Sequence, residues 1–204
     1  MDTAIWFDMD GTILRYDSTR KELFEQVIAD PPPGARETFK RGVFNSLDNP
    51  ARHSYEVGFE QVKAEHNVAV VPDKAAEAYA LAERQATTIT DRTVEMLYAL
   101  QQRAYIGILT NGDRDVQHKK LEYHGIKEVF EEIILSADVG ISKPDKLFFE
   151  RAFTRVDADE HVYVGDDYQL DIAPTRELGF KTVHVRNDDG PQISLQQVGD
   201  LPVL

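Results

Sequence analysis

The sequence predicts an α/β fold in which a parallel sheet is interrupted, after its first strand, by an inserted helical segment. Short apolar runs alternate with helix-length segments over residues 91–204, which is typical of crossover units in a parallel sheet. Residues 15–90 instead contain helical patterns separated by proline-containing breaks. With 204 residues, the chain suits one domain with a smaller insert. We therefore expect a core of residues 1–14 and 91–204 and a helical cap domain of residues 15–90.

The first strand and the helices of the insert follow from the spacing of apolar residues. Residues 4–7 form an unbroken apolar run, which favours a strand covered on both faces. Ser18 can cap a helix that carries Leu23 and Phe24 on one face. Further helices are expected around residues 39–44, around 55–62 and from Pro72 onward, and the only strand-like run in the insert is 68–71.

The second part of the core alternates between helices and strands. Helices are expected over residues 91–103, 115–124, around 147–153 and ending near Leu178, and strands at 105–109, 133–135, 162–164 and 182–185. Gly125 and Gly179 follow two of these helices and suit the left-handed conformation that often ends a helix. This order predicts that the strands lie parallel.

Composition excludes several classes of protein. The chain contains no cysteine, so it has no disulfide, thiolate metal site or cysteine nucleophile. Its net charge of −13 disfavours binding to nucleic acid or to an anionic membrane. No apolar run approaches the roughly 20 residues of a membrane span, and residues 1–3 lack the features of a signal peptide. We expect a cytoplasmic protein that binds neither nucleic acid nor membrane.

Polar residues gather where the expected strands end. They are Asp8, Asp10 and Thr12 after the first strand, Thr110, Asn111 and Gly112 after the second, Lys143 after the third, and Asp166, Asp167 and Asp171 after the fourth. Each group alone could be an ordinary turn or helix cap. Together they are more specific, because the carboxyl ends of parallel strands meet at one crevice, where ligands of open α/β sheets bind.

Such a crevice favours phosphoryl chemistry. Converging carboxylates repel one another unless a cation lies between them, and oxygen ligands suit Mg²⁺. A cation, a lysine, a hydroxyl and turn amides can together hold the oxygens of a phosphoryl group. One carboxylate can then attack phosphorus to form an aspartyl-phosphate, and a second can serve as general acid and base.

These residues resemble the four motifs of the haloacid dehalogenase (HAD) superfamily, in its phosphatase and nucleotidase branch. The motifs are Asp8-Met9-Asp10-Gly11-Thr12, Leu109-Thr110-Asn111-Gly112, Lys143-Pro144 and Val164-Gly165-Asp166-Asp167 with Asp171, and similarity continues through Gln117, Lys120-Leu121 and residues 136–145. The resemblance covers residues 4–14 and about 105–185. It implies a Rossmann-like core, a helical cap, and Mg²⁺ as cofactor.

The resemblance also implies a role for each matched residue. Asp8 would be the nucleophile, and Asp10 the acid/base. Thr110, the amides of Asn111 and Gly112, and Lys143 would hold the phosphate, and Lys143 would also offset charge on the nucleophile. Asp8, Asp166 and the backbone carbonyl of Asp10 would bind the metal, assisted by Asp167 or Asp171, directly or through water.

The implied function is a Mg²⁺-dependent phosphomonoester hydrolase that acts on a small phosphorylated metabolite. Nucleoside monophosphates, phosphoglycolate and sugar phosphates are the candidate substrates, and the oligomeric state stays open. Alternatives are a phosphomutase, a haloacid dehalogenase of the same superfamily, or a non-catalytic binding protein on this fold. Asp10 disfavours the dehalogenase, which generally lacks an aspartate two residues after its nucleophile.

Overall fold

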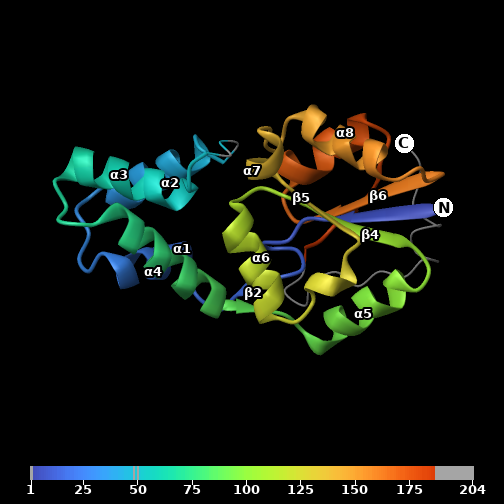
Figure 1. Cartoon of the computed structure of the whole chain (residues 1–204), viewed down its shortest axis with the longest axis horizontal. Coiled ribbons are helices and arrows are strands. Elements are labelled where there is room, and N and C mark those ends of the chain that lie inside the picture. Colours follow the sequence, from blue (N-terminus) through green and yellow to red (C-terminus); the bar gives the residue numbers. More distant parts are fainter. Residues whose placement is uncertain (1, 48, 50, 187–204) are drawn as a thin grey trace.

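The computed structural model describes residues 2–47, 49 and 51–186, and it has two lobes (Figure 1). The larger lobe contains a five-stranded sheet in the order β5-β4-β1-β6-β7, with every neighbouring pair parallel. Its strands are β1 (Thr3–Phe7), β4 (Tyr105–Thr110), β5 (Glu132–Leu135), β6 (Glu160–Gly165) and β7 (Lys181–His184). The predicted α/β class with a parallel sheet is therefore confirmed. Residues 187–204, which the sequence assigns to the core, lie outside the described residues.

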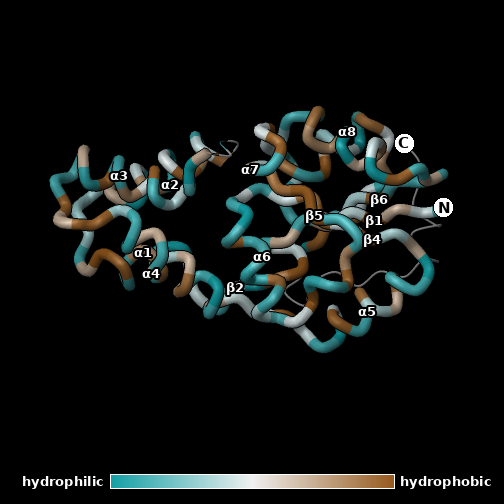
Figure 2. The backbone as a smooth tube through the Cα atoms, viewed as in Figure 1, coloured by the Kyte–Doolittle hydropathy of each residue, from teal (hydrophilic) through white to brown (hydrophobic). Residues whose placement is uncertain are grey.

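Helices cover both faces of this sheet. On one face, α5 (Asp91–Gln101) and α6 (Arg114–Tyr123) contribute leucines to a cluster with alternate residues of β1, β4 and β6. On the other face, α8 (Lys146–Arg155) packs its phenylalanines against Trp6 and Tyr163. Figure 2 shows hydrophilic and hydrophobic residues alternating along these outer helices. Because β1 is central and covered on both sides, its residues Ala4–Phe7 are fully buried, as an unbroken apolar run predicts.

The smaller lobe is helical and has a core of its own. It contains α1 (Arg20–Val27), α2 (Ala35–Phe44), α3 (Ser54–His66) and α4 (Pro72–Gln85). Phe24, Phe39, Phe59 and Tyr79 form its aromatic centre, with ring centroids 4.5 Å apart for Phe39 and Phe59. These helices come from the segment between β1 and β4, so the lobe is inserted into the sheet after its first strand (Figure 1).

A pair of short strands joins the lobes, and the sequence analysis missed it. β2 (Arg15–Tyr16) pairs antiparallel with β3 (Thr87–Thr88) at the two ends of the helical segment. Residues 68–71, the run that resembled a strand, are irregular. Two-residue strands are too short to show the alternation by which a strand is recognised. The cap of α1 is also Thr19 rather than Ser18, because Thr19 forms a capping box with Glu22.

Smaller elements complete the chain between the strands. They are a short 3₁₀ turn (Lys127–Val129), α7 (Ser136–Val139), a π-helical turn (Tyr168–Ile172) and α9 (Ala173–Glu177). The π-helical turn is separated from the end of β6 by two residues and carries Asp171 back toward the end of that strand. In the part of the chain that the structure describes, no helix is both long and apolar enough to cross a membrane.

Candidate active site

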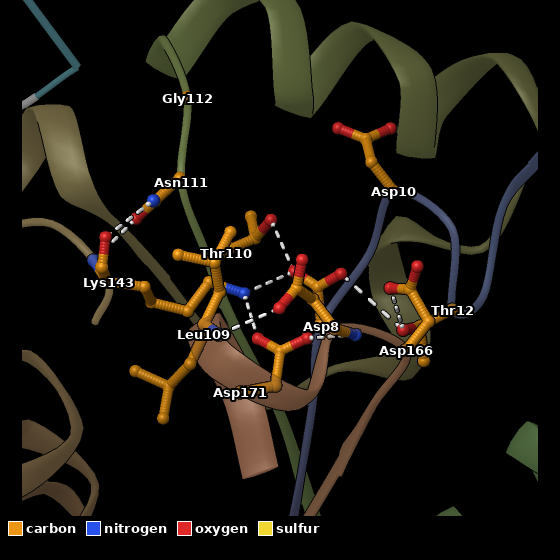
Figure 3. Close-up of polar contacts among 12 residues, drawn as sticks. Asp8, Asp10, Thr12, Leu109, Thr110, Asn111, Gly112, Lys143, Asp166 and Asp171 are labelled. Carbon is orange, nitrogen blue, oxygen red and sulfur yellow. Dashed lines mark hydrogen bonds and ion pairs between the residues drawn. The ribbon is translucent and has the colours of Figure 1, made fainter. Parts of the chain in front are cut away.

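Three neighbouring strands deliver the central residues of the site. β1 lies between β4 and β6, and Phe7 is level with Ile108 and Val164 in the register of the sheet. Asp8, Thr110 and Asp166 therefore emerge close together at one edge (Figure 3). A cleft of about 210 Å³ opens there, and it is lined by Asp8, Asp10, Thr110, Asn111, Lys143, Asp166, Asp167, Leu170 and Asp171.

Asp8 is buried and strongly hydrogen-bonded. Its Oδ1 accepts hydrogen bonds from the Thr110 hydroxyl at 3.0 Å and from Lys143 Nζ at 2.6 Å. Burial raises the pKa of Asp8 to about 7, with Lys143 opposing this shift and the negative charges of Asp171 and Asp166 adding to it. Any positive charge bound beside these carboxylates would favour the ionised form of Asp8.

Lys143 links two carboxylates beneath the cleft. Its ammonium lies 2.7 Å from Asp171 Oδ1 and 3.2 Å from the Tyr163 hydroxyl, in addition to its contact with Asp8. Burial opposes its charge, but Asp171 and Asp8 together raise the pKa of Lys143 well above its usual value. Tyr163 donates to the carbonyl oxygen of Leu109 at 2.9 Å. Lys143 is thus held as a cation directly against Asp8.

Asp166 lies on the other side of Asp8 and is only partly buried. The Thr12 hydroxyl donates to its Oδ1 at 3.0 Å. Burial raises the pKa of Asp166, and the hydrogen bond from Thr12 partly offsets this. Gly11 makes the arrangement possible, because it has a φ of 93° and a Cβ there would lie 2.4 Å from Asp166 Oδ2. The backbone can approach this carboxylate closely only at a glycine.

The acidic cluster fits a hard divalent cation. Asp8, Asp166 and Asp171 each offer a carboxylate oxygen, and these oxygens all lie within 4.8 Å of one another. The buried ammonium of Lys143 contacts Asp8 and Asp171 and offsets one of these three negative charges. The donor set consists of oxygen alone, which is the preference of Mg²⁺. Charge and donor chemistry both suit this ion.

The loop after β4 is tied to the lysine loop. Asn111 Nδ2 donates to the carbonyl oxygen of Lys143 at 3.2 Å, and the Lys143 amide donates to Asn111 Oδ1 at 2.9 Å. The Gly112 amide donates to Ser136 Oγ at 3.0 Å, and Ser136 donates in turn to the carbonyl oxygen of Leu47 in the helical lobe. Asn111 therefore fixes the position of Lys143 by its side chain.

Asp10 does not join the carboxylate cluster. Figure 3 shows its carboxylate pointing away from Asp8, toward α6. There it accepts from Gln117 Nε2 at 2.8 Å and lies 3.0 Å from Lys120 Nζ, and the Tyr16 hydroxyl also donates to it. Burial would raise the pKa of Asp10, but Lys120, Arg20 and these hydrogen bonds lower it to about 2. In this position the side chain is ionised.

Asp167 and Asp171 have different surroundings. Asp167 is exposed, and its Oδ1 accepts from the amides of Gln169 and Leu170, so it caps the π-helical turn. Asp171 is buried, and its Oδ2 accepts from the Asp167 amide at 3.1 Å. The structure thus brings Asp171 into the cluster beside Asp8 and leaves the Asp167 side chain at its rim.

Other residues of the site were missed by sequence reasoning. Ser136 directly follows β5 and could have been found by the rule that located the other polar residues at strand ends. Tyr163 lies inside an apolar strand, where a tyrosine gives no sign of a polar contact. Tyr16, which donates to Asp10, comes from the joining strand β2. Glu83, which pairs with Lys120, comes from α4.

Comparison with known proteins gives consistent matches. The family model described as haloacid dehalogenase-like hydrolase matches residues 5–185. The pyrimidine 5'-nucleotidase YjjG of Escherichia coli is 27% identical, over 87% of this chain and 83% of that protein. The ribulose-1,5-bisphosphate 5-phosphatase of Halopiger xanaduensis is 26% identical, over 90% of this chain and 84% of that protein. A HAD family enzyme of Bacteroides thetaiotaomicron, solved in complex with magnesium and inorganic phosphate, has the same fold, with a TM-score of 0.73, 17% identity and coverage of 96% and 99%.

Proposed function

Because the chain belongs to the haloacid dehalogenase-like hydrolases and is a phosphatase of that superfamily, we propose that it hydrolyses small phosphate monoesters with Mg²⁺ and through an aspartyl-phosphate on Asp8. The observation that carries this proposal is the buried Asp8 carboxylate, which is held by Thr110 and Lys143 beside the acidic cluster. A carboxylate so placed is fixed in orientation, and Lys143 favours its ionised form.

In the first half-reaction, Asp8 attacks phosphorus and the bond from phosphorus to the alcohol oxygen breaks. Lys143 and the Thr110 hydroxyl reach the same oxygen of Asp8 and hold phosphoryl oxygens beside it. The Asn111 amide adds a donor, and the Gly112 amide can do so once it leaves Ser136. Mg²⁺, held by Asp8, Asp166 and the Asp10 carbonyl, would offset negative charge on the phosphoryl group.

Asp10 acts as acid and base in the two half-reactions. It takes up a proton from solvent once its carboxylate has left Lys120, gives that proton to the departing alcohol oxygen, and then takes one from the water that attacks the aspartyl-phosphate. Attack by water releases inorganic phosphate and regenerates Asp8. Since Asp10 points toward α6 (Figure 3), its side chain has to rotate toward the leaving oxygen before the first of these transfers.

We further propose that residues 15–90 are a cap domain that selects the substrate. This segment contacts the sheet lobe through Leu47, which accepts from Ser136, through Ser54, which donates to Asp113, and through α4, which packs on α6. Two relatives act, by name, on a pyrimidine nucleotide and on ribulose bisphosphate. Nucleoside monophosphates and sugar phosphates are therefore the substrates to test first, and phosphoglycolate is the third class to test. Asp171, already bound to Lys143 and Tyr163, would assist the metal through water.

The proposed function predicts Mg²⁺-dependent release of inorganic phosphate. Purified protein should hydrolyse p-nitrophenyl phosphate and at least one of the three metabolite classes, and excess EDTA should abolish turnover until Mg²⁺ is restored. Undiminished hydrolysis in EDTA would contradict the metal dependence. Release of halide from 2-haloacids without phosphatase activity would favour the dehalogenase. Isomerisation of a sugar phosphate would favour the phosphomutase, and the absence of any turnover would favour a binding protein.

Mg²⁺ should also stabilise the folded protein, because it would relieve repulsion among Asp8, Asp166 and Asp171. A ligand at one hundred times its Kd adds about 2.7 kcal/mol to the free energy of unfolding, which corresponds to a rise in Tm of roughly 5–10 °C for a chain of this size. Asp166→Asn should lose most of this rise in a thermal melt. Asp167→Asn is the matched control and should keep it, since Asp167 caps its own turn. An equal rise in both variants would place the metal elsewhere.

A further inference from the structure

A second group of buried charges lies behind the carboxylate cluster, at the junction of the two lobes. Lys120 Nζ is 3.0 Å and 3.1 Å from the two carboxylate oxygens of Asp10, and 3.1 Å from Glu83 Oε2. The side chains of Lys120 and Glu83 are only 1% and 2% exposed. One buried ammonium is therefore shared by two carboxylates.

These two carboxylates belong to different lobes. Asp10 follows β1 of the sheet lobe, whereas Glu83 is in the last turns of α4 in the helical lobe. Lys120 is on α6, the helix on which α4 packs. Just beyond Glu83 the chain enters β3, one of the two short strands that join the lobes. The shared ion pair thus lies where the helical lobe meets the sheet lobe.

Tyr16 connects the same groups from the other joining strand. Its hydroxyl accepts from Lys120 Nζ at 2.9 Å, donates to Asp10, and lies 3.4 Å from Glu83 Oε1. Glu83 is also bound by Arg20, whose guanidinium stacks over the Tyr16 ring, and by the Tyr55 hydroxyl at 2.5 Å. The network holds two carboxylates and two cations, so its charges balance.

This balance bears on the movement that the proposed mechanism requires. For Asp10 to reach the leaving oxygen, its carboxylate must part from Lys120. A buried cation that loses its only anionic partner is strongly destabilised. Glu83 already lies against the same ammonium and has its own support from Arg20 and Tyr55. Lys120 therefore stays paired when Asp10 turns away.

We propose that Glu83 of the helical lobe is a positioning residue for Asp10: by pairing with Lys120, it lets Asp10 exchange its position against α6 for one beside the leaving group. This inference rests on the proposed function, in which Asp10 is the acid/base. It also links the placement of the acid/base to the packing of α4 on α6, so that the lobe assigned to substrate selection acts on the proton transfer.

The test is the rate of the first half-reaction in Glu83→Gln. Without the second carboxylate, Lys120 has Asp10 as its remaining anionic partner in this network and should hold it against α6. In a single-turnover measurement, the rate of alcohol release from the best alkyl phosphate should fall by about tenfold or more. This is a part of the roughly 10²–10⁴-fold rate increase that general acid catalysis supplies. Release of p-nitrophenol from p-nitrophenyl phosphate, which needs little protonation, should change less than about threefold.

A double variant distinguishes positioning from damage to the fold. Glu83→Gln with Lys120→Gln removes one charge of each sign and leaves Asp10 balanced by Arg20. It should return the alkyl rate to within about threefold of the unaltered enzyme, because Asp10 is no longer held. If Glu83→Gln does not fold, the alkyl rate of the double variant is the remaining test, and a selective loss of that rate would contradict the positioning role. Glu65→Gln is the control, since Glu65 is an exposed carboxylate of the same lobe that pairs with Arg41.

The outcomes separate this inference from the function on which it rests. Equal slowing with alkyl and aryl phosphates in Glu83→Gln, or no recovery in the double variant, overturns the positioning role. If Asp10→Asn slows alkyl phosphates selectively while Glu83→Gln does not, the proposed function stands and the positioning role falls. If Asp8→Asn keeps its activity, the proposed function itself fails.

Discussion

Asp8→Asn is expected to lower kcat/KM for every phosphate monoester by at least roughly a thousandfold, equivalent to about 4 kcal/mol in the activation barrier. The substitution keeps the shape of the side chain and removes the charge that attacks phosphorus in the proposed mechanism. Lys143 and Thr110 still find an oxygen acceptor, so the site should assemble. No step can replace the lost nucleophile, because the aspartyl-phosphate cannot form on an amide.

Steady-state kinetics and thermal unfolding of the same preparation check this expectation. The Asp8→Asn protein should unfold no earlier than the unaltered one in the absence of metal, since it loses one of three mutually repelling carboxylates. Low activity in a protein that melts much earlier would point to a structural role instead. Activity within about tenfold of the unaltered enzyme, or about 1.4 kcal/mol, would exclude Asp8 as the nucleophile.

The site residues that are easiest to place from sequence lie at the end of a buried strand. Asp8, Thr110 and Asp166 come at the ends of three apolar runs, and a parallel sheet brings such ends to one edge. The strands themselves were recognisable because each is covered on both faces and lacks polar interruptions. The architecture and the centre of the site thus depend on local patterns that a single sequence displays.

Contacts between the lobes could not be predicted in this way. Glu83 and Lys120 are far apart in the chain, and a glutamate in an alanine-rich helix resembles any solvated one. The strands β2 and β3 pair across the whole helical segment although each has only two residues. The orientation of Asp10 has the same origin, because α6 and the connecting strand decide it. Tertiary packing determines these features, and no periodic pattern in the sequence records them.

Asp10→Asn should affect the two half-reactions differently according to the leaving group. An alkoxide is a poor leaving group, so the first step with an alkyl phosphate should slow by roughly 10²–10⁴-fold without a general acid. A nitrophenolate needs little protonation, and its release should be almost unchanged. The fold should tolerate the substitution because Lys120 keeps Glu83 as a partner.

In Asp10→Asn, hydrolysis of the aspartyl-phosphate then becomes the slow step for aryl phosphates, since no base removes a proton from the attacking water. Mixing this variant with p-nitrophenyl phosphate should produce a burst of p-nitrophenol, about one equivalent per active site, before slow turnover. An alkyl phosphate should give no burst. The competing interpretation is that Asp10 only shapes the turn before Gly11, which would slow both substrates alike. Stopped-flow and quenched-flow measurements decide between them, and equal slowing of the first step would remove Asp10 from the acid/base role.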